Sequence, residues 1–237
     1  MWQTASLLPA AARAVVRAAA TGRGAPLDAS TPPTPSFIHL HLGIRADGLS
    51  EQALSSIHHI VVPEWSKLTQ PQSAAFVSMP SLIDPSLAPA GRHVIHAYLP
   101  ATEPYEVWQG VARGTPAYDA LKEERAAPLY AAIERFIPDV RERVEVELIG
   151  SPLTHERFLR RHRGTYGPEL SAADSTFPGA KTQVDGLLCC GDSCWPGIGV
   201  PAVAGSGIAA AHVVTGALAQ RELLREMRLR GTLLPAL

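Results

Sequence analysis

Residues that could bind a ligand carrying phosphate and hydroxyl groups gather near the end of the chain, in the stretch 186–207. An apolar run there leads into Gly191-Asp192, and a loop rich in Gly and Pro follows. The carboxylate of Asp192 could accept hydrogen bonds from ribose or sugar-alcohol hydroxyls, while Gly191 would let a diphosphate approach the backbone. Loops of this kind can bring backbone amides and a helix N-terminus against a ligand with negative charge.

The pattern around this pair predicts a buried strand over 186–190, a tight loop, and a helix that begins close to the loop. The Gly199-Val200-Pro201 turn would direct the helix N-terminus at a second part of the same ligand, where its amides stabilise an electron-rich ring edge. The alternative is an ordinary strand-to-helix loop in which Gly and Pro serve the geometry alone. Spacing by itself favours this alternative.

A second group of chemically active residues is the histidine pair His39 and His41. These histidines alternate with Ile38, Leu40 and Leu42, which predicts a strand with one polar and one apolar face. Two histidines at this spacing could bind a metal, but no cysteine or carboxylate cluster accompanies them in the sequence. We therefore predict structural histidines and no metal site.

The three cysteines do not indicate a disulfide framework or a zinc site. Cys189 and Cys190 are adjacent, Cys194 follows shortly after, and the sequence contains no second spaced pair. We interpret Cys189 and Cys190 as small buried residues at a strand end, which is compatible with a reducing compartment.

Composition bounds the class of protein. The 237 residues are 46% hydrophobic and 18% charged, which is typical of a globular chain with one large domain or two small ones. The formal net charge of −1 provides no overall field that would attract nucleic acid or an acidic membrane. We see no apolar run that is both long enough to span a bilayer and free enough of Gly and Pro. Contact with a membrane through one face stays compatible with this composition.

The remaining segments predict several short strands and three helices. Strands are expected over 36–44, 56–62, 74–79, 92–99 and 144–149, and their succession indicates a sheet with antiparallel pairs. Helices are expected over 116–136, over 154–160 and from about Pro201 past Arg230, with Gly216 as the candidate break. In the short helix we expect Thr154 as the N-cap and Arg157 at the capping-box position. The first part of the last helix is apolar and should be buried, whereas its later part is charged and should be exposed.

The N-terminal residues 1–29 are rich in Ala, contain three arginines and carry no acid before Asp28. This composition is typical of an organelle transit peptide. It is also compatible with a surface helix over roughly Pro9–Ala20, followed by the stiff, Pro-rich linker 31–35. Composition alone leaves both interpretations open.

Several stretches together carry a resemblance to the carotenoid isomerase and phytoene-desaturase-type flavoproteins, a branch of the amine-oxidase-like superfamily. Beside the stretch 186–207, the similar segments are PSFIHLHLG (35–43), IHHIVV (57–62), DPSLAP (84–89), LKEER (121–125) and FLRRHRGTYGP (158–168), in the order of that family. The resemblance extends over roughly Trp2–Ala219. Trp2-Gln3-Thr4 resembles the segment before the family's substrate domain, which weakens the transit-peptide interpretation.

The resemblance implies FAD as cofactor and assigns residues to it. Gly191 and Asp192 match the pair that meets the ribityl and diphosphate region of the flavin. The segment beside the isoalloxazine ring matches Ile198, Gly199, Val200, Pro201, Ala202 and Val203. Tyr166 and Gly167 would lie near the flavin and the substrate cavity. No residue is assigned as a catalytic acid or base, because in this family the flavin carries the chemistry.

The resemblance also implies an α/β fold with α+β character and three regions. These are a helical N-terminal segment (1–30), part of a substrate domain with a mixed sheet and helices (31–180), and the last strand and helix of a doubly wound FAD-binding domain (181–237). Members of the family begin with a strand and a Gly-x-Gly-x-x-Gly turn. Gly22 and Gly24 follow no strand and lack the third glycine, so the chain resembles the C-terminal portion alone. An N-terminal FAD-binding half is then an expected partner.

The function implied is that of an FAD-dependent carotenoid cis–trans isomerase or polyene desaturase acting on a long apolar polyene. The alternative is a non-catalytic remnant or truncated fragment that serves as a binding or assembly subunit. The resemblance implies a carotenoid or similar polyene as substrate, peripheral contact with a membrane and no nucleic-acid partner. It also implies a plastid location, or a cytoplasmic one if the source is bacterial.

Overall fold

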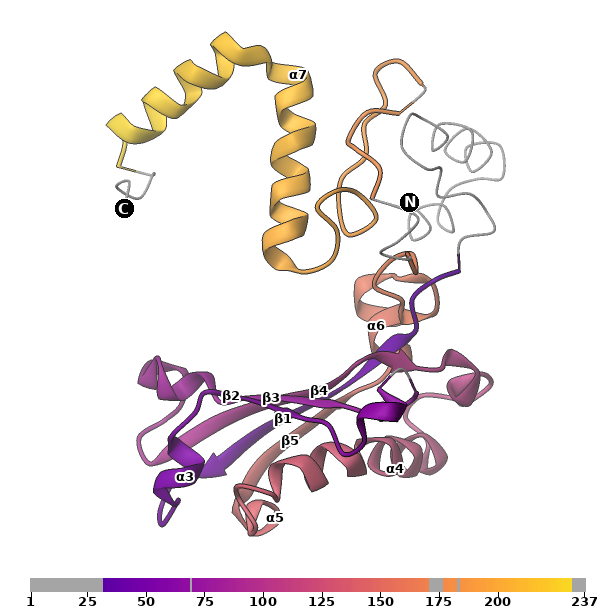
Figure 1. Ribbon diagram of the computed structural model, residues 1–237, viewed down its shortest axis with the longest axis vertical. Coiled ribbons are helices and arrows are strands. Elements are labelled where there is room, and N and C mark those ends of the chain that lie inside the picture. The colour runs from indigo at the N-terminus through magenta and orange to yellow at the C-terminus, as the bar shows by residue number, and fades with distance from the viewer. Residues whose placement is uncertain (1–31, 69, 171–176, 183, 232–237) are drawn as a thin grey trace. The chain divides into compact units, whose positions relative to one another are not determined.

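The computed structural model describes residues 32–231, apart from 69, 171–176 and 183. The helix expected over 9–20 lies outside these residues. The chain divides into two compact units, one of Thr34–Tyr166 and one of Met1–Pro33 with Gly167–Leu237. The first unit is a sheet with a long helix on one face, and the second contains a loop region followed by the last helix (Figure 1).

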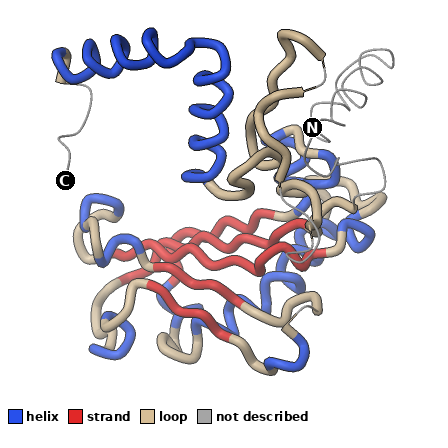
Figure 2. Tube along the Cα trace, turned by 45° about the horizontal axis from the view of Figure 1, so that its top comes forward, coloured by secondary structure: helices blue, strands red, loops and turns tan. Residues whose placement is uncertain are grey.

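The first unit is built on a five-stranded sheet with the strand order β2-β3-β4-β1-β5. Its strands are drawn in red in Figure 2. Its strands are β1 (Ser36–Arg45), β2 (His58–Val61), β3 (Ala75–Ser78), β4 (Arg92–Glu103) and β5 (Val144–Gly150). The four pairings are all antiparallel, which confirms the α+β character and the expected antiparallel pairs. The described sheet is not mixed, because the chain reverses direction between every pair of neighbouring strands.

The helices around the sheet are short, with one exception. They are α3 (Glu51–Leu54), α4 (Pro116–Ile133), α5 (Val140–Arg143) and α6 (Pro152–Leu159), with 3₁₀ turns η1 (Trp65–Lys67), η2 (Pro80–Leu82), η3 (Pro85–Leu87), η4 (Tyr105–Trp108) and η5 (His162–Gly164). The long helix α4 begins where expected, because the Thr115 side chain accepts a hydrogen bond from the Tyr118 amide and Pro116 fits the first turn. It ends at Ile133, three residues before the expected end, and the chain continues in a turn in which the Phe136 and Ile137 amides donate to the Ile133 carbonyl.

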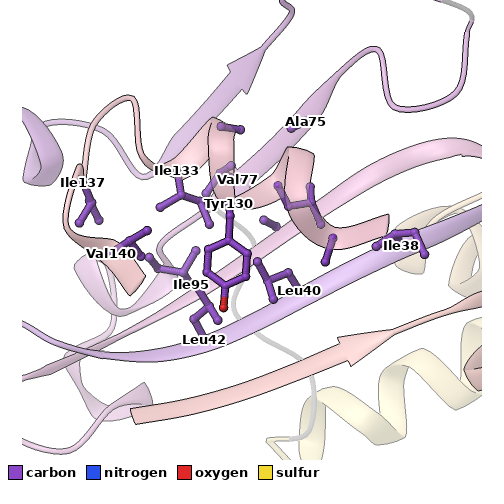
Figure 3. Close-up of a cluster of buried hydrophobic side chains, with 14 of the residues drawn as sticks. Ile38, Leu40, Leu42, Ala75, Val77, Ile95, Tyr130, Ile133, Ile137 and Val140 are labelled. Atoms are coloured by element: carbon purple, nitrogen blue, oxygen red, sulfur yellow. The ribbon is translucent and has the colours of Figure 1, made fainter. Parts of the chain in front are cut away.

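The core lies between α4 and one face of the sheet. Alternate residues of β1, including Ile38, Leu40 and Ile44, are fully buried there, as their spacing predicts. Figure 3 shows side chains of β1, β3 and β4 meeting Tyr130 and Ile133 of α4. Burying such aliphatic side chains contributes about 1.5–3 kcal/mol each, so this contact fixes which face of every strand points inward.

The prediction for the N-terminus of α6 was wrong. Ser151 is the N-cap, its side chain accepts from the Thr154 amide, and the Thr154 side chain accepts from the Ser151 amide. Thr154 is therefore the third residue of a capping box, and Arg157 lies in the last turn. The helix begins earlier than expected because Pro152 is favoured at a first helical position, where its missing N–H has no partner to lose.

In the second unit, α7 (Val200–Leu229) has the expected extent, and Gly216 kinks it with φ 62° and ψ 163°. The prediction that its first part is buried was wrong, because Val200 is 81% and Val214 is 74% exposed. An apolar helix needs an apolar partner, and the described residues of this unit contain no sheet that could cover it. By length and composition alone, α7 could also cross a membrane, contrary to the expectation from the sequence.

A buried ion pair connects β4 to α4. Glu103 is fully buried, accepts a hydrogen bond from the Trp108 indole at 2.8 Å and pairs with Arg125 through two contacts of 2.9 and 2.8 Å. A buried carboxylate is tolerated only with such partners, because removing one leaves a charge in a medium of low polarity. The pair thus fixes the end of β4 against the helix that covers the core.

We predict that Arg125→Met destabilises the fold by about 3–5 kcal/mol, because Glu103 would keep its burial and lose its counter-charge. The control is Arg92→Met, which breaks the Arg92–Glu145 pair in which both side chains are 41% exposed. That change should cost less than about 1 kcal/mol. Urea unfolding followed by far-UV circular dichroism measures the free energy of unfolding of both variants. An equal loss of stability in the two variants would contradict the stabilising role of the buried Glu103–Arg125 pair.

Candidate functional site

The Gly191-Asp192 pair lies in a loop that is tied to the first turns of α7. The Gly191 amide donates to the Ser206 hydroxyl at 2.7 Å, and that hydroxyl donates to the Val203 carbonyl at 2.8 Å. Gly191 has φ 113°, a conformation that residues with a side chain rarely adopt. Asp192 is 6% exposed, and the Ser193 hydroxyl lies 3.5 Å from its Oδ1. The predicted loop and helix therefore form one unit.

Open space lies beside the backbone at two glycines of this loop. A Cβ atom placed on Gly191 or Gly199 would meet no atom within 4 Å. Gly199 precedes α7, and no side chain caps the helix N-terminus there. A helix start of this kind leaves amide groups and partial positive charge for a ligand. The loop thus combines an approachable backbone, a buried carboxylate and a helix N-terminus, and their binding of a ligand stays a prediction.

The strand predicted over 186–190 does not form. Its backbone makes one isolated bridge, between Lys181 and Leu188, and the Cys189 amide donates to the Ala180 carbonyl at 2.9 Å. A strand requires a partner strand along its length, and the described backbone of this segment makes scattered contacts instead, including the Leu187 amide to the Val184 carbonyl. Cys190 is exposed, which corrects the prediction that it is buried, while Cys189 is half-buried and Cys194 is buried.

Tyr166 and Gly167 are neighbours in sequence that belong to different units. Gly167 packs against the loop, since a Cβ atom there would lie 3.2 Å from the Asp192 carbonyl oxygen. The Tyr166 ring instead contacts Phe37 of β1, with ring centroids 4.5 Å apart, and its hydroxyl lies 3.3 Å from His155 Nδ1. Of the predicted site residues, the structure thus brings Gly167 together with Asp192 and Ile198, and Tyr166 together with the sheet.

Histidines and aromatic residues gather on the sheet face that α4 does not cover, which we call the histidine face. It consists of Phe37, His39, His41, Phe76, His96 and Tyr98. His96 of β4 is paired with His41 of β1, their rings are stacked with centroids 4.5 Å apart, and His96 Nε2 lies 2.8 Å from His39 Nδ1. Sequence reasoning found His39 and His41 and missed His96. The alternation of polar and apolar residues within 92–99 would have indicated which face of the strand carries His96.

Two cavities open on this face. One, of about 890 Å³, is lined by all three histidines together with His155, Tyr166 and Phe158. It also extends to residues outside this face, among them Arg113, Glu147 and, from α4, Asp119, Lys122 and Glu123. The other, of about 670 Å³, is mainly apolar and is lined by Val94, Val146, Leu148, Ala88 and Pro89 beside His41 and His96. Cavities of this size accommodate an organic molecule or a segment of a larger one.

His39 and His96 of this face are neutral near pH 7. Burial and the neighbouring His155, His96 and His41 lower the pKa of His39 to about 3. Burial, reinforced by His41, lowers the pKa of His96 to about 4. The face therefore presents aromatic rings without positive charge, and a ring nitrogen of each histidine keeps a lone pair.

The lowered pKa of His39 predicts acid sensitivity. The unfolded chain takes up a proton on His39 below about pH 6.5, whereas the folded chain does not until about pH 3. The free energy of unfolding should therefore fall as the pH drops through this window, with His39 contributing on the order of 1–2 kcal/mol between pH 7 and pH 5. Urea unfolding of His39→Gln in EDTA-containing buffer should show a shallower pH dependence than the parent chain. The exposed His58→Gln is the control, and identical slopes for parent and His39→Gln would refute the prediction.

Comparison with known proteins identifies the family. No protein-family model matches the sequence. The chloroplastic prolycopene isomerase of Arabidopsis thaliana is 39% identical over 76% of this chain and 30% of its own length. The corresponding protein of Daucus carota is 38% identical over 78% of this chain and 30% of its own. A neurosporene-forming phytoene desaturase of Rhodobacter capsulatus is 29% identical over 60% of this chain and 27% of its own.

The chain thus spans about a third or less of the length of these relatives. An oxidoreductase structure from Methanosarcina mazei aligns with 77% of this chain and 35% of its own at 17% identity, and its TM-score of 0.38 is too low to support an argument. The identity to the isomerases extends over most of this chain and agrees with the resemblance seen in its motifs. The chain therefore belongs to the carotenoid isomerase and phytoene-desaturase-type family of oxidoreductases.

Proposed function

We propose that this chain is part of an FAD-dependent oxidoreductase that isomerises or desaturates a long apolar polyene, with a carotenoid cis–trans isomerase as the closer analogue. The observation that carries the proposal is the 39% identity to a relative named prolycopene isomerase, over 76% of the chain. The loop with Gly191, Asp192 and the start of α7 adds support, because its chemistry fits a flavin nucleotide.

Each part of that loop has a role in this proposal. Asp192 would accept hydrogen bonds from ribityl or ribose hydroxyls, and the open space beside Gly191 would admit the diphosphate. The segment Ile198–Val203, with the N-terminus of α7, would direct amide groups at the isoalloxazine edge. A bound flavin would supply the redox chemistry.

The apolar cavity on the histidine face is the proposed site for a segment of the polyene. Val146 is 56% and Leu148 is 64% exposed, so their side chains offer apolar surface that a hydrocarbon would cover. The neighbouring His41 and His96 rings add aromatic surface, and burial keeps the pKa of both below the usual value. The lining is mainly apolar, with the Arg92–Glu145 ion pair as its charged part, and a polyene needs apolar contact and no ionised catalytic group.

Three further assignments belong to this proposal. The exposed apolar residues of α7 support contact with a membrane surface, from which a carotenoid would enter. The names of the isomerase relatives, which are chloroplastic, support a plastid location. In the family that the sequence resembles, a Gly-x-Gly-x-x-Gly turn binds the diphosphate, so we propose that a further segment with this turn completes the FAD site.

Asp192→Ala should weaken FAD binding by on the order of 1–3 kcal/mol, because the buried carboxylate would no longer accept hydrogen bonds from the ligand. Flavin fluorescence titration of the purified chain measures the affinity. The control is Asp185→Ala, which removes an exposed carboxylate upstream of the same loop. The assigned role of Asp192 is refuted if parent and Asp192→Ala bind FAD equally well.

Leu148→Glu should lower the conversion of a poly-cis carotenoid by on the order of tenfold, because the polyene would have to desolvate a charge in its cavity. The assay supplies reduced FAD and the carotenoid in liposomes to the purified chain and separates the isomers by chromatography. Ile83→Glu, at a side chain that is 66% exposed and does not line this cavity, is the control. A parent chain that stays colourless, takes up no FAD and leaves the carotenoid unchanged would count against activity of this chain by itself, without the further segment that completes the FAD site.

A further inference from the structure

Three histidines on the histidine face have the arrangement of a metal-binding site. His39 and His41 point to the same side of β1, and His96 of the neighbouring strand β4 is paired with His41. One ligand nitrogen from each of the three lies within 4.8 Å of those from the other two. Imidazole nitrogen is the commonest protein ligand for zinc and the other late first-row divalent cations.

The backbone around these residues is held firmly enough to support a site. β1 is a central strand that pairs with β4 over nearly its whole length and with β5 on its other side. The opposite side chains of the same strands are locked in the core. Sites built on strands keep their geometry better than sites on loops, so the three imidazoles differ from a bound arrangement only by side-chain rotation.

The distances are close to those that a metal requires. Tetrahedral zinc with Zn–N bonds of about 2.0–2.1 Å holds its ligand nitrogens about 3.4 Å apart. His39 Nδ1 and His96 Nε2 lie 2.8 Å apart and share a hydrogen bond, so metal binding requires the donor ring to carry its proton on its other nitrogen. One nitrogen of His41 lies within 4.8 Å of a nitrogen of each of the other two histidines. Small rotations about the side-chain torsions therefore suffice to place the three nitrogens around one ion.

Packing alone does not explain these histidines. The Nε2 atoms of His39 and His155 are buried and have no hydrogen-bond partner among the described residues. A buried polar atom without a partner costs about 1–3 kcal/mol, so such an atom usually has a role or an additional ligand. His155 of α6 lies beside the cluster, with its ring centroid 5.0 Å from that of His39, and is available as a further ligand.

We propose that His39, His41 and His96 bind a late first-row divalent cation, such as Zn²⁺, on the face of the sheet opposite α4. Three protein ligands leave a fourth position open toward the cavity of about 890 Å³, where water or His155 could complete the coordination. The site contains no carboxylate ligand, which disfavours Mg²⁺ and Ca²⁺. The exposed His41 ring gives the ion access from solvent. The proposal does not depend on flavin or polyene binding.

The test is metal titration of the full chain, purified without a histidine tag and stripped with EDTA. Competition with a chromophoric zinc indicator should show one equivalent of tightly bound Zn²⁺. His41→Ala and His96→Gln should each weaken binding by at least about tenfold, as the loss of a ligand requires. His58→Ala and His93→Ala remove other histidines of the first unit and should leave the affinity unchanged. Circular dichroism confirms that each variant is folded.

Cobalt distinguishes this site from the cysteines of the second unit. Co²⁺ bound by three imidazoles should give weak visible d–d bands without the intense near-ultraviolet band of a thiolate ligand. A thiolate band would show that Cys189, Cys190 or Cys194 holds the ion and would overturn the proposal. Zinc binding that is equally tight in the parent chain and in the His41→Ala/His96→Gln double variant would also overturn it, as would an absence of saturable binding.

Discussion

The contact between α4 and one face of the sheet is the constraint on which the rest of the first unit depends. Because side chains alternate along a strand, burying Ile38, Leu40 and Leu42 under the helix forces His39 and His41 to the opposite face. A shift of one residue in the register of β1 would exchange the two sets and bury the histidines in the core. The hydrophobic energy of the core therefore selects the residues that form the histidine face.

The helices and strands of this unit were predicted well because the spacing of apolar residues within each segment indicates its secondary structure. The alternation within 36–44 and the helical spacing within 116–136 both gave elements close to those observed. The histidine cluster was missed because it depends on pairing between strands that are 57 residues apart at His39 and His96. A single strand reveals which of its residues share a face, but only the register with its neighbour reveals which residues meet across it.

In the second unit, composition predicted the turns but not the burial of the helix. Composition correctly indicated the loop at Gly191 and the break at Gly216, because positive φ values are strongly tied to glycine. It failed for the burial of α7 and for the strand over 186–190, since both depend on partners that a local pattern does not contain. The exposed Val214 and Leu218 side chains give α7 an apolar surface of the kind that usually binds another molecule. A protein domain, a flavin or a lipid surface would each remove that surface from water.

The two cavities of the histidine face share the rings of His41 and His96, so a ligand in either cavity meets the same two groups. Each proposed occupant requires these rings to be neutral, for different reasons. A polyene would have to remove water from a charged imidazolium in order to contact it, and this desolvation is unfavourable. A metal ion needs the nitrogen lone pair, which protonation removes. Burial on the sheet lowers the pKa of both His96 and His41 and so favours the neutral form that either occupant requires.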